Sequence, residues 1–149
     1  MRELKFLPVA QAVASLSKDP STKVGAILLD DDSNIRCVGF NGFARGVHDY
    51  PERLNNRETK LLYTSHAEQN LIAQAARMGV TTNGCTILVT ALYPCTRCAS
   101  SIIQAGIKKV IAPHMDTERV NKQWFEEQLI AEKMFNEGGV EVVRYGQQT

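Results

Sequence analysis

The second half of the chain alternates helical and strand patterns, and this alternation limits the fold more than any other feature. From Ser65 onward, three segments with a helical pattern are each followed by a short apolar run. The predicted helices cover residues 66–78, 95–105 and 122–136, and the strands cover residues 86–90, 108–112 and 140–144. Connections of this kind place the strands in one sheet with helices packed on it.

The first 64 residues predict a helix and a pair of strands. An amphipathic helix is expected to begin at Glu3 or Pro8 and to end at Ser17. The apolar runs 24–29 and 35–40 are predicted to pair antiparallel, and residues 41–62 to form a long charged loop. The whole chain therefore predicts an α/β fold: a three-layer α/β/α sandwich on a five-stranded mixed sheet, with residues 1–149 as a single domain.

The composition is that of a folded domain without a strongly charged surface. Hydrophobic residues make up 44%, and 17 Lys and Arg against 16 Asp and Glu give a formal net charge of +1. This balance creates no basic field, so we expect no nucleic-acid partner. No stretch approaches the ~20 apolar residues of a membrane span, and the N-terminal residues make a poor signal peptide. We therefore expect no membrane partner and a cytoplasmic location.

The four cysteines divide into two pairs by their context. Cys37 and Cys85 lie in apolar predicted strands, where cysteine behaves as a small buried hydrophobe. Cys95 and Cys98 are separated by two residues at the start of a predicted helix. A lone CxxC can also be a redox pair or half of a structural zinc site. Because no second CxxC exists, a four-cysteine site would have to recruit Cys37 and Cys85 from strands.

The tripeptide HAE, residues 66–68, begins another predicted helix and complements the motif PCTRC. Two thiolates and one imidazole make a zinc site with an open fourth position, which is typical of catalytic zinc. Helix N-termini also stabilise thiolates. We therefore predict that His66, Cys95 and Cys98 bind one catalytic zinc ion. Glu68 is rotated away from His66, and we predict that it moves protons between a water at the open position and a leaving nitrogen.

The combination H-x-E with P-C-x-x-C is the signature of zinc nucleobase deaminases, and the chain resembles the cytidine and deoxycytidylate deaminase family beyond it. The similar segments are KDPSTKVGAILL, GFNGFARG, SHAEQN and ALYPCTRCASSIIQAGIKKVIA, residues 18–29, 39–46, 65–70 and 91–112. The resemblance weakens after Pro113, and Phe40 and Ala44 stand where the family often has Tyr and Pro. It implies a cytidine deaminase-like fold and zinc-dependent hydrolysis of dCMP to dUMP and ammonia, which supplies thymidine nucleotide synthesis.

The resemblance also implies roles in substrate binding. Asn41 would contact the sugar or base, the backbone amide of Ala67 would meet the pyrimidine carbonyl, and Lys23 would lie near the pocket rim. A turn asparagine and an ordinary surface lysine are the alternatives for Asn41 and Lys23. The candidates for a phosphate anchor are all basic: Lys23, Arg45, Arg53, Arg57, Lys60 and His114. The stretch ERLNNRETK, residues 52–60, is equally compatible with a solvated helical face.

Members of this family are commonly hexameric, activated by dCTP and inhibited by dTTP. The resemblance therefore implies a homo-oligomer. It also implies that dCTP and dTTP bind together with Mg²⁺ in the loop 41–62. The last predicted helix carries four apolar residues, which either form an assembly face or pack in the core: Trp124, Phe125, Leu129 and Phe135.

The competing functions are deamination of another cytosine nucleoside or nucleotide, deamination of nucleic acid, and a non-catalytic zinc-stabilised nucleotide-binding module. Glu68 argues against the last, because structure alone does not require that carboxylate.

Overall fold

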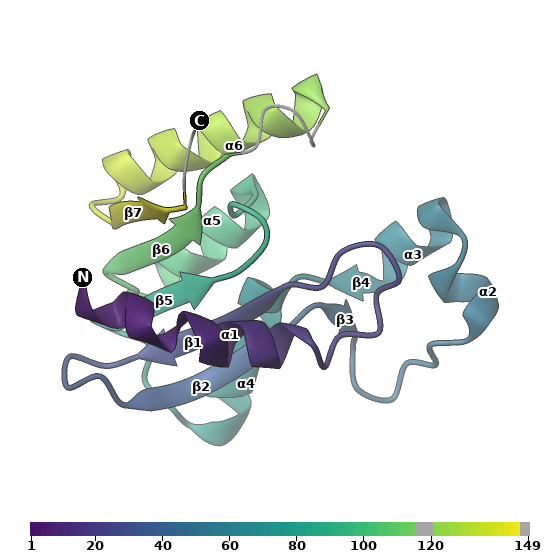
Figure 1. The fold of residues 1–149 in the computed structure, drawn as a ribbon, viewed down its shortest axis with the longest axis horizontal. Helices are drawn as coiled ribbons and strands as arrows, with labels where there is room; N and C mark the ends of the chain where they lie inside the picture. Colours follow the sequence, from purple (N-terminus) through teal and green to yellow (C-terminus); the bar gives the residue numbers. More distant parts are fainter. Residues whose placement is uncertain (116–120, 147–149) are drawn as a thin grey trace.

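The computed structural model describes residues 1–115 and 121–146, which form three layers around a five-stranded sheet of order β2-β1-β5-β6-β7 (Figure 1). Strand β1 (Gly25–Leu29) pairs antiparallel with both β2 (Ile35–Phe40) and β5 (Thr86–Val89). Strands β6 (Lys109–Pro113) and β7 (Glu141–Tyr145) continue the sheet in parallel with β5. The predicted fold class is therefore confirmed.

Helices cover both faces of this sheet. The short 3-10 helix η1 (Arg2–Phe6) and α1 (Leu7–Ala14) pack on one face, and α4 (Ala67–Met78), α5 (Thr96–Gln104) and α6 (Lys122–Glu137) pack on the other. The side chains of β1 alternate between the two cores: Ala26 and Leu28 join the α4–α6 side, and Ile27 and Leu29 join the α1 side. Because both sides are covered, every residue of β1 is buried.

Residues 41–62, predicted as a long loop, carry local structure of their own. They contain β3 (Gly42–Phe43), α2 (Pro51–Leu54) and most of α3 (Arg57–Tyr63). Strand β3 pairs antiparallel with β4 (Thr64–Ser65), so that α2 and α3 form an arm beside the main sheet (Figure 1). No described helix is both long and apolar enough to cross a membrane.

The start of α4 differs by one residue from the predicted one. The sequence pattern predicts Ser65 as the cap with Glu68 completing a capping box, but the N-cap is His66. The box residue is Gln69, whose Oε1 accepts a hydrogen bond from the His66 backbone amide at 3.1 Å. Glu68 is therefore free of a capping role, and its side chain is buried.

Gly39 allows β2 to lie close to this helix start. A Cβ at Gly39 would lie 2.5 Å from the Ala67 carbonyl oxygen and 2.6 Å from the Leu71 amide nitrogen. Any other residue would push α4 away from the sheet, because those neighbours are backbone atoms. The N-terminus of α4, and with it His66, is thus placed by the absence of a side chain on β2.

Candidate functional site

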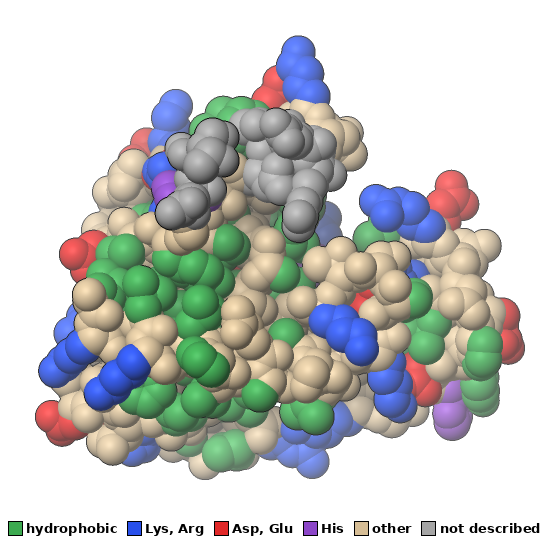
Figure 2. All heavy atoms as spheres, viewed as in Figure 1, with side chains coloured by type: hydrophobic (Ala, Val, Ile, Leu, Met, Phe, Trp, Pro, Cys, Tyr) green, Lys and Arg blue, Asp and Glu red, His purple; other side chains and the backbone are tan. Residues whose placement is uncertain are grey.

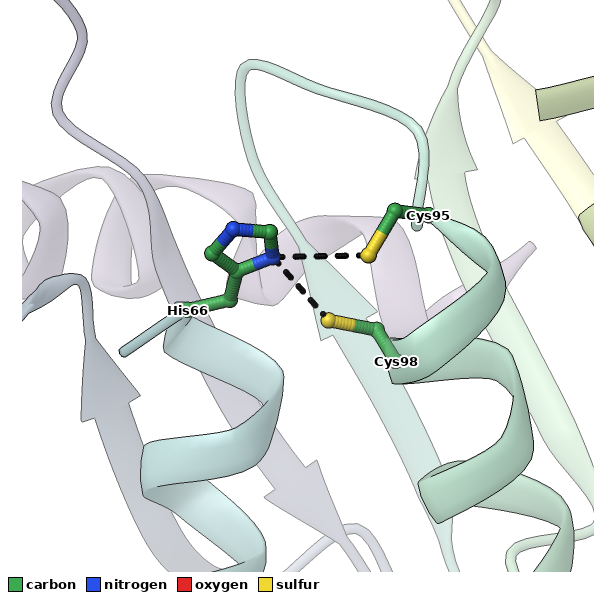
Figure 3. Close-up of side chains that lie close together, drawn as sticks. All are labelled: His66, Cys95 and Cys98. Atoms are coloured by element: carbon green, nitrogen blue, oxygen red, sulfur yellow. Dashed lines mark hydrogen bonds between the residues drawn. The ribbon is translucent and has the colours of Figure 1, made fainter. Parts of the chain in front are cut away.

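His66, Cys95 and Cys98 meet where the N-termini of α4 and α5 approach each other (Figure 3). His66 and Cys95 are the N-cap residues of the two helices, and Cys98 lies in the first turn of α5. The His66 Nδ1 atom lies 3.4 Å from Cys95 Sγ and 3.3 Å from Cys98 Sγ. Tetrahedral zinc with ordinary bond lengths separates such nitrogen and sulfur ligands by about 3.5 Å. Both the donor set and its spacing fit a zinc ion.

The hydrogen bond between the two cysteines shifts their pKa values in opposite directions. The hydrogen bond from Cys98 lowers the pKa of Cys95 to about 4, and His66 adds to this effect against the opposing burial. The same hydrogen bond, together with burial, raises the pKa of Cys98. The hydrogen bond to Cys95 also raises the pKa of His66. The pair therefore loses its first proton easily and its second with difficulty, and a divalent cation between the sulfurs would displace that second proton.

Glu68 lies beside this triad but outside it. It is the second residue of α4, its side chain is buried, and it lines the same cavity as His66 and Cys95. Burial raises the pKa of Glu68 to about 7, against the lowering effects of its backbone hydrogen bond and of His66. A carboxyl group in this range can both accept and donate a proton, and a bound cation would lower its pKa.

A cavity of about 580 Å³ opens over the triad. Its volume lies within the range of about 300–1,000 Å³ that is usual for small-molecule sites. Its lining includes two members of the metal-ligand cluster, His66 and Cys95, and the neighbouring residues Ala67 and Glu68. The remaining described lining comes from the segment before β1, from Asn41 after β2, from α3 and Thr64, from residues 91–93 and from the start of α6. The site is therefore assembled from segments that are far apart in sequence.

Asn41 and Ala67, the predicted substrate-binding residues, both line this cavity. The Asn41 side chain also organises the segment before β1: its Oδ1 accepts from the Val24 amide at 2.9 Å and its Nδ2 donates to the Thr22 carbonyl at 2.9 Å. Ala67 is the first residue of α4, a position whose backbone N–H has no intrahelical acceptor. Both residues thus lie in the cavity wall, and their contacts with a substrate stay a prediction.

The basic candidates separate into two groups. Arg57 and Lys60 of α3 line the cavity, and the buried Lys60 ammonium also pairs with Asp19 Oδ1 at 3.0 Å. The others do not lie among the described lining residues. Lys23 is exposed, and His114 follows β6. Arg45 donates to Gln74 of α4, and the Arg53 guanidinium lies over the Tyr63 ring at 4.4 Å.

Sequence reasoning missed three contributors to the site. Asp19 fixes the segment before β1 by accepting from the amides of Ser21 and Thr22, and pairs with Lys60 across a long sequence separation. Asn121 and Trp124, at the start of α6, line the cavity. The sequence contains a capping signal for Asn121, but no local pattern indicates which residues a helix start faces.

The apolar residues of α6 do not form one assembly face. Phe135 is fully buried in the core, and Phe125 packs against the same core. Leu129 is exposed, whereas Trp124 is half-buried at the cavity. Core packing is thus the better interpretation for Phe125 and Phe135.

Comparison with known proteins agrees with this geometry. Residues 1–113 match the family described as the cytidine and deoxycytidylate deaminase zinc-binding region. An uncharacterized deaminase of the luxG 3′ region of Aliivibrio fischeri is 44% identical over 93% of this chain and 89% of its own length. The deoxycytidylate deaminase of Homo sapiens is 42% identical over 71% of this chain, which spans 61% of that relative.

Solved structures show the same fold. The apo structure of the dCMP deaminase from cyanophage S-TIM5 superposes with a TM-score of 0.72, at 25% identity and 97% coverage of both chains. The family match extends over both halves of the ligand cluster, since His66, Cys95 and Cys98 all lie within residues 1–113. The chain belongs to the cytidine and deoxycytidylate deaminase family.

Proposed function

We propose that this protein hydrolyses dCMP to dUMP and ammonia with one zinc ion per chain. The observation that carries the proposal is the convergence of His66, Cys95 and Cys98 beside the buried carboxyl group of Glu68, in a cavity large enough for a nucleotide. The choice of dCMP is supported by relatives named as deoxycytidylate deaminases, such as the human protein. Formation of dUMP would supply thymidine nucleotide synthesis.

In this proposal, the three ligands and Glu68 have separate tasks. His66, Cys95 and Cys98 hold the zinc ion, which when bound supplies a Lewis acid that lets water lose a proton near neutral pH. Glu68 accepts that proton as the water oxygen bonds to the pyrimidine C4. It passes this proton to the ring N3 as the C4–N3 double bond becomes single, then takes the remaining proton of the added hydroxyl and delivers it to the amino nitrogen as the C4–N bond breaks, so that ammonia leaves and the C4 carbonyl forms. The position of Glu68, buried in the cavity wall two residues after His66, supports both transfers.

The cavity walls support the proposed placement of the nucleotide. Asn41 and the amide of Ala67 lie beside the triad and would hold the sugar or base. Arg57 forms no ion pair among the residues that the structure describes, whereas the charge of Lys60 is compensated by Asp19. We therefore assign Arg57 as the main phosphate anchor, with Lys60 in support. Lys23 and His114 are not among the described lining residues, and their roles in substrate binding stay predictions.

Regulation and assembly belong to the same proposal. A second cavity of about 300 Å³ is lined by residues 42–47, including Arg45, and supports a site for dCTP or dTTP with Mg²⁺. Leu61 and Leu62 on α3 are exposed, Leu62 to 87%, and such side chains support a homo-oligomer, which we propose to be a hexamer. The cytoplasmic location and the single domain over residues 1–149 stay predictions.

A substrate panel tests the proposed function. Zinc-loaded protein is assayed for ammonia release from cytosine, deoxycytidine, dCMP, CMP, dCTP and a single-stranded oligonucleotide. We expect the highest kcat/KM for dCMP, and Arg57→Ala to lower it for dCMP while leaving deoxycytidine unaffected. Equal values for dCMP and deoxycytidine would contradict phosphate recognition, and zinc binding without any turnover would indicate the binding module instead.

The oligonucleotide represents the competing nucleic-acid function. Basic side chains on the face shown in Figure 2 are dispersed among acidic and apolar ones rather than gathered into one field. An extended phosphate backbone binds best to a continuous basic surface. Preferential deamination of the oligonucleotide would overturn the proposed substrate.

A further inference from the structure

Helix α6 contributes to the cavity although it lies outside the matched family region. That region ends at residue 113, whereas α6 covers Lys122–Glu137. Asn121 and Trp124 at its start line the cavity together with His66 and Glu68. Trp124 is half-buried, and its indole N–H donates to no acceptor among the described residues. Helix α6 therefore supplies one wall of the cavity from outside the matched family region.

One hydrogen bond joins α6 to the zinc-ligand segment, and a cap and a core contact fix the helix itself. Asn121 caps the helix by accepting a hydrogen bond from the Trp124 amide at 2.7 Å. One turn later, Glu127 Oε1 accepts from the Thr96 hydroxyl at 3.0 Å, and Thr96 directly follows Cys95. Further along the same face, Phe135 is fully buried in the core. Residues three, four, seven and eleven apart share a helix face, so the anchored face is the one that carries Trp124.

We propose that Trp124 packs against the nucleoside part of the substrate and contributes to its binding. This inference rests on the proposed function and adds a contact to it. The indole offers a large apolar face and one N–H donor, which suit a base or sugar and contribute little to binding a phosphate. The cationic groups that suit a phosphate, Arg57 and Lys60, come from α3 instead. The two helices thus divide recognition between nucleoside and phosphate.

Kinetics with two substrates test this division. Trp124→Ala should lower kcat/KM for dCMP and for deoxycytidine by the same factor, about tenfold or more, chiefly through KM. Trp124→Phe should recover most of the loss, and Gln123→Ala, an exposed neighbour in the same turn, should change nothing. Zinc content should stay the same in all three variants. Unchanged constants in Trp124→Ala, or a loss confined to dCMP, would overturn the assignment.

A binding measurement separates this inference from the proposed function. Trp124 is the single tryptophan of the chain, so its fluorescence reports this wall of the cavity alone. In the zinc-loaded protein, dCMP, the product dUMP and deoxyuridine should each shield Trp124 from acrylamide quenching, and inorganic phosphate should not. Shielding without deamination of dCMP would refute the proposed function and support the role of Trp124. Deamination without shielding would refute the role of Trp124 alone, and the absence of both would refute both.

Discussion

The buried ion pair between Asp19 and Lys60 makes a strong quantitative prediction, because the two partners are supported unequally. The exposed fractions of their side chains are 10% and 8%. Asp19 Oδ1 accepts from Lys60 Nζ at 3.0 Å and also from the amides of Ser21 and Thr22 at 2.8 and 3.0 Å. Lys60 has only one other partner among the described residues, the Ser21 hydroxyl at 3.2 Å.

Substitution of Asp19 should therefore lower the free energy of unfolding more than substitution of Lys60. Asp19→Ala leaves a buried ammonium with one hydroxyl and frees two backbone amides, and breaking a buried pair in this way costs about 3–5 kcal/mol. Lys60→Met leaves the carboxylate with both amides and keeps the apolar stem, so the loss is that of one charge-assisted hydrogen bond, about 1.5–3 kcal/mol. For a chain of this size, each kcal/mol lowers Tm by about 2–4 °C.

The pH dependence of this pair follows from the lowered pKa of Asp19. Burial alone would raise that pKa, but the Thr22 and Ser21 amides and Lys60 together outweigh burial and lower it below its ordinary value of 3.8. A carboxyl group with a lowered folded-state pKa stabilises the fold above its unfolded-state pKa, and this stabilisation is lost as the pH falls through the folded-state pKa. The difference between wild type and Lys60→Met should hence be constant above about pH 5 and shrink below about pH 4.

Urea unfolding at one protein concentration measures these differences, since the proposed assembly would make stability depend on concentration. Lys18→Met is the matched control: its pair with Asp49 is shorter, at 2.8 Å, but the side chains are 72% and 43% exposed. An exposed pair contributes about 0–1 kcal/mol, so this variant should unfold almost as wild type does. A Lys60→Met variant as unstable as Asp19→Ala would refute the claim that the two amides hold the carboxylate.

Three further substitutions test the candidate metal centre. Wild-type protein should contain about one zinc per chain, and Cys98→Ala should lose most of it; full metal content in that variant would exclude Cys98 as a ligand. Glu68→Gln should keep its zinc and lose about 10²–10⁴-fold in kcat, so near-normal turnover would contradict a proton-transfer role. Gly39→Ala places a Cβ 2.5 Å from the Ala67 carbonyl oxygen and should destabilise the fold by about 1–3 kcal/mol while weakening zinc binding through His66. A Gly39→Ala protein with unchanged Tm and zinc affinity would show that α4 can shift freely.

The sheet and its long helices could be predicted from the sequence because their signals are local. Strand β2 has its predicted bounds, and α6 ends one residue beyond the prediction. The position of β1 between β2 and β5 was not predicted in detail, because strand order depends on contacts between distant segments. Helices α2 and α3, with 4 and 7 residues, are too short for a helical period to stand out in a charged segment.

The candidate site divides in the same way. His66, Cys95 and Cys98 could be predicted because each motif lies within a few residues, and the helix starts direct their side chains to one point. From the sequence, Lys60 fits a phosphate anchor and a surface lysine equally well. In the structure it pairs with Asp19, and this ion pair joins residues that are 41 positions apart. A basic residue in a charged stretch shows its charge in the sequence, but only the folded chain shows what compensates that charge.

This division explains how one fold can serve different substrates. The chemistry requires a histidine, two cysteines and a glutamate in fixed relation, and the starts of α4 and α5 provide that relation through local sequence. Recognition requires walls that differ between substrates, and in our proposal α3 and α6 provide them through Arg57 and Trp124, which line the cavity. Helix α6 lies beyond residue 113, where the match to the zinc-binding region ends, so this wall is separate in sequence from the metal ligands. Relatives that share the zinc ligands but lack an aromatic residue at the start of α6 should therefore bind zinc equally well and differ in nucleoside preference.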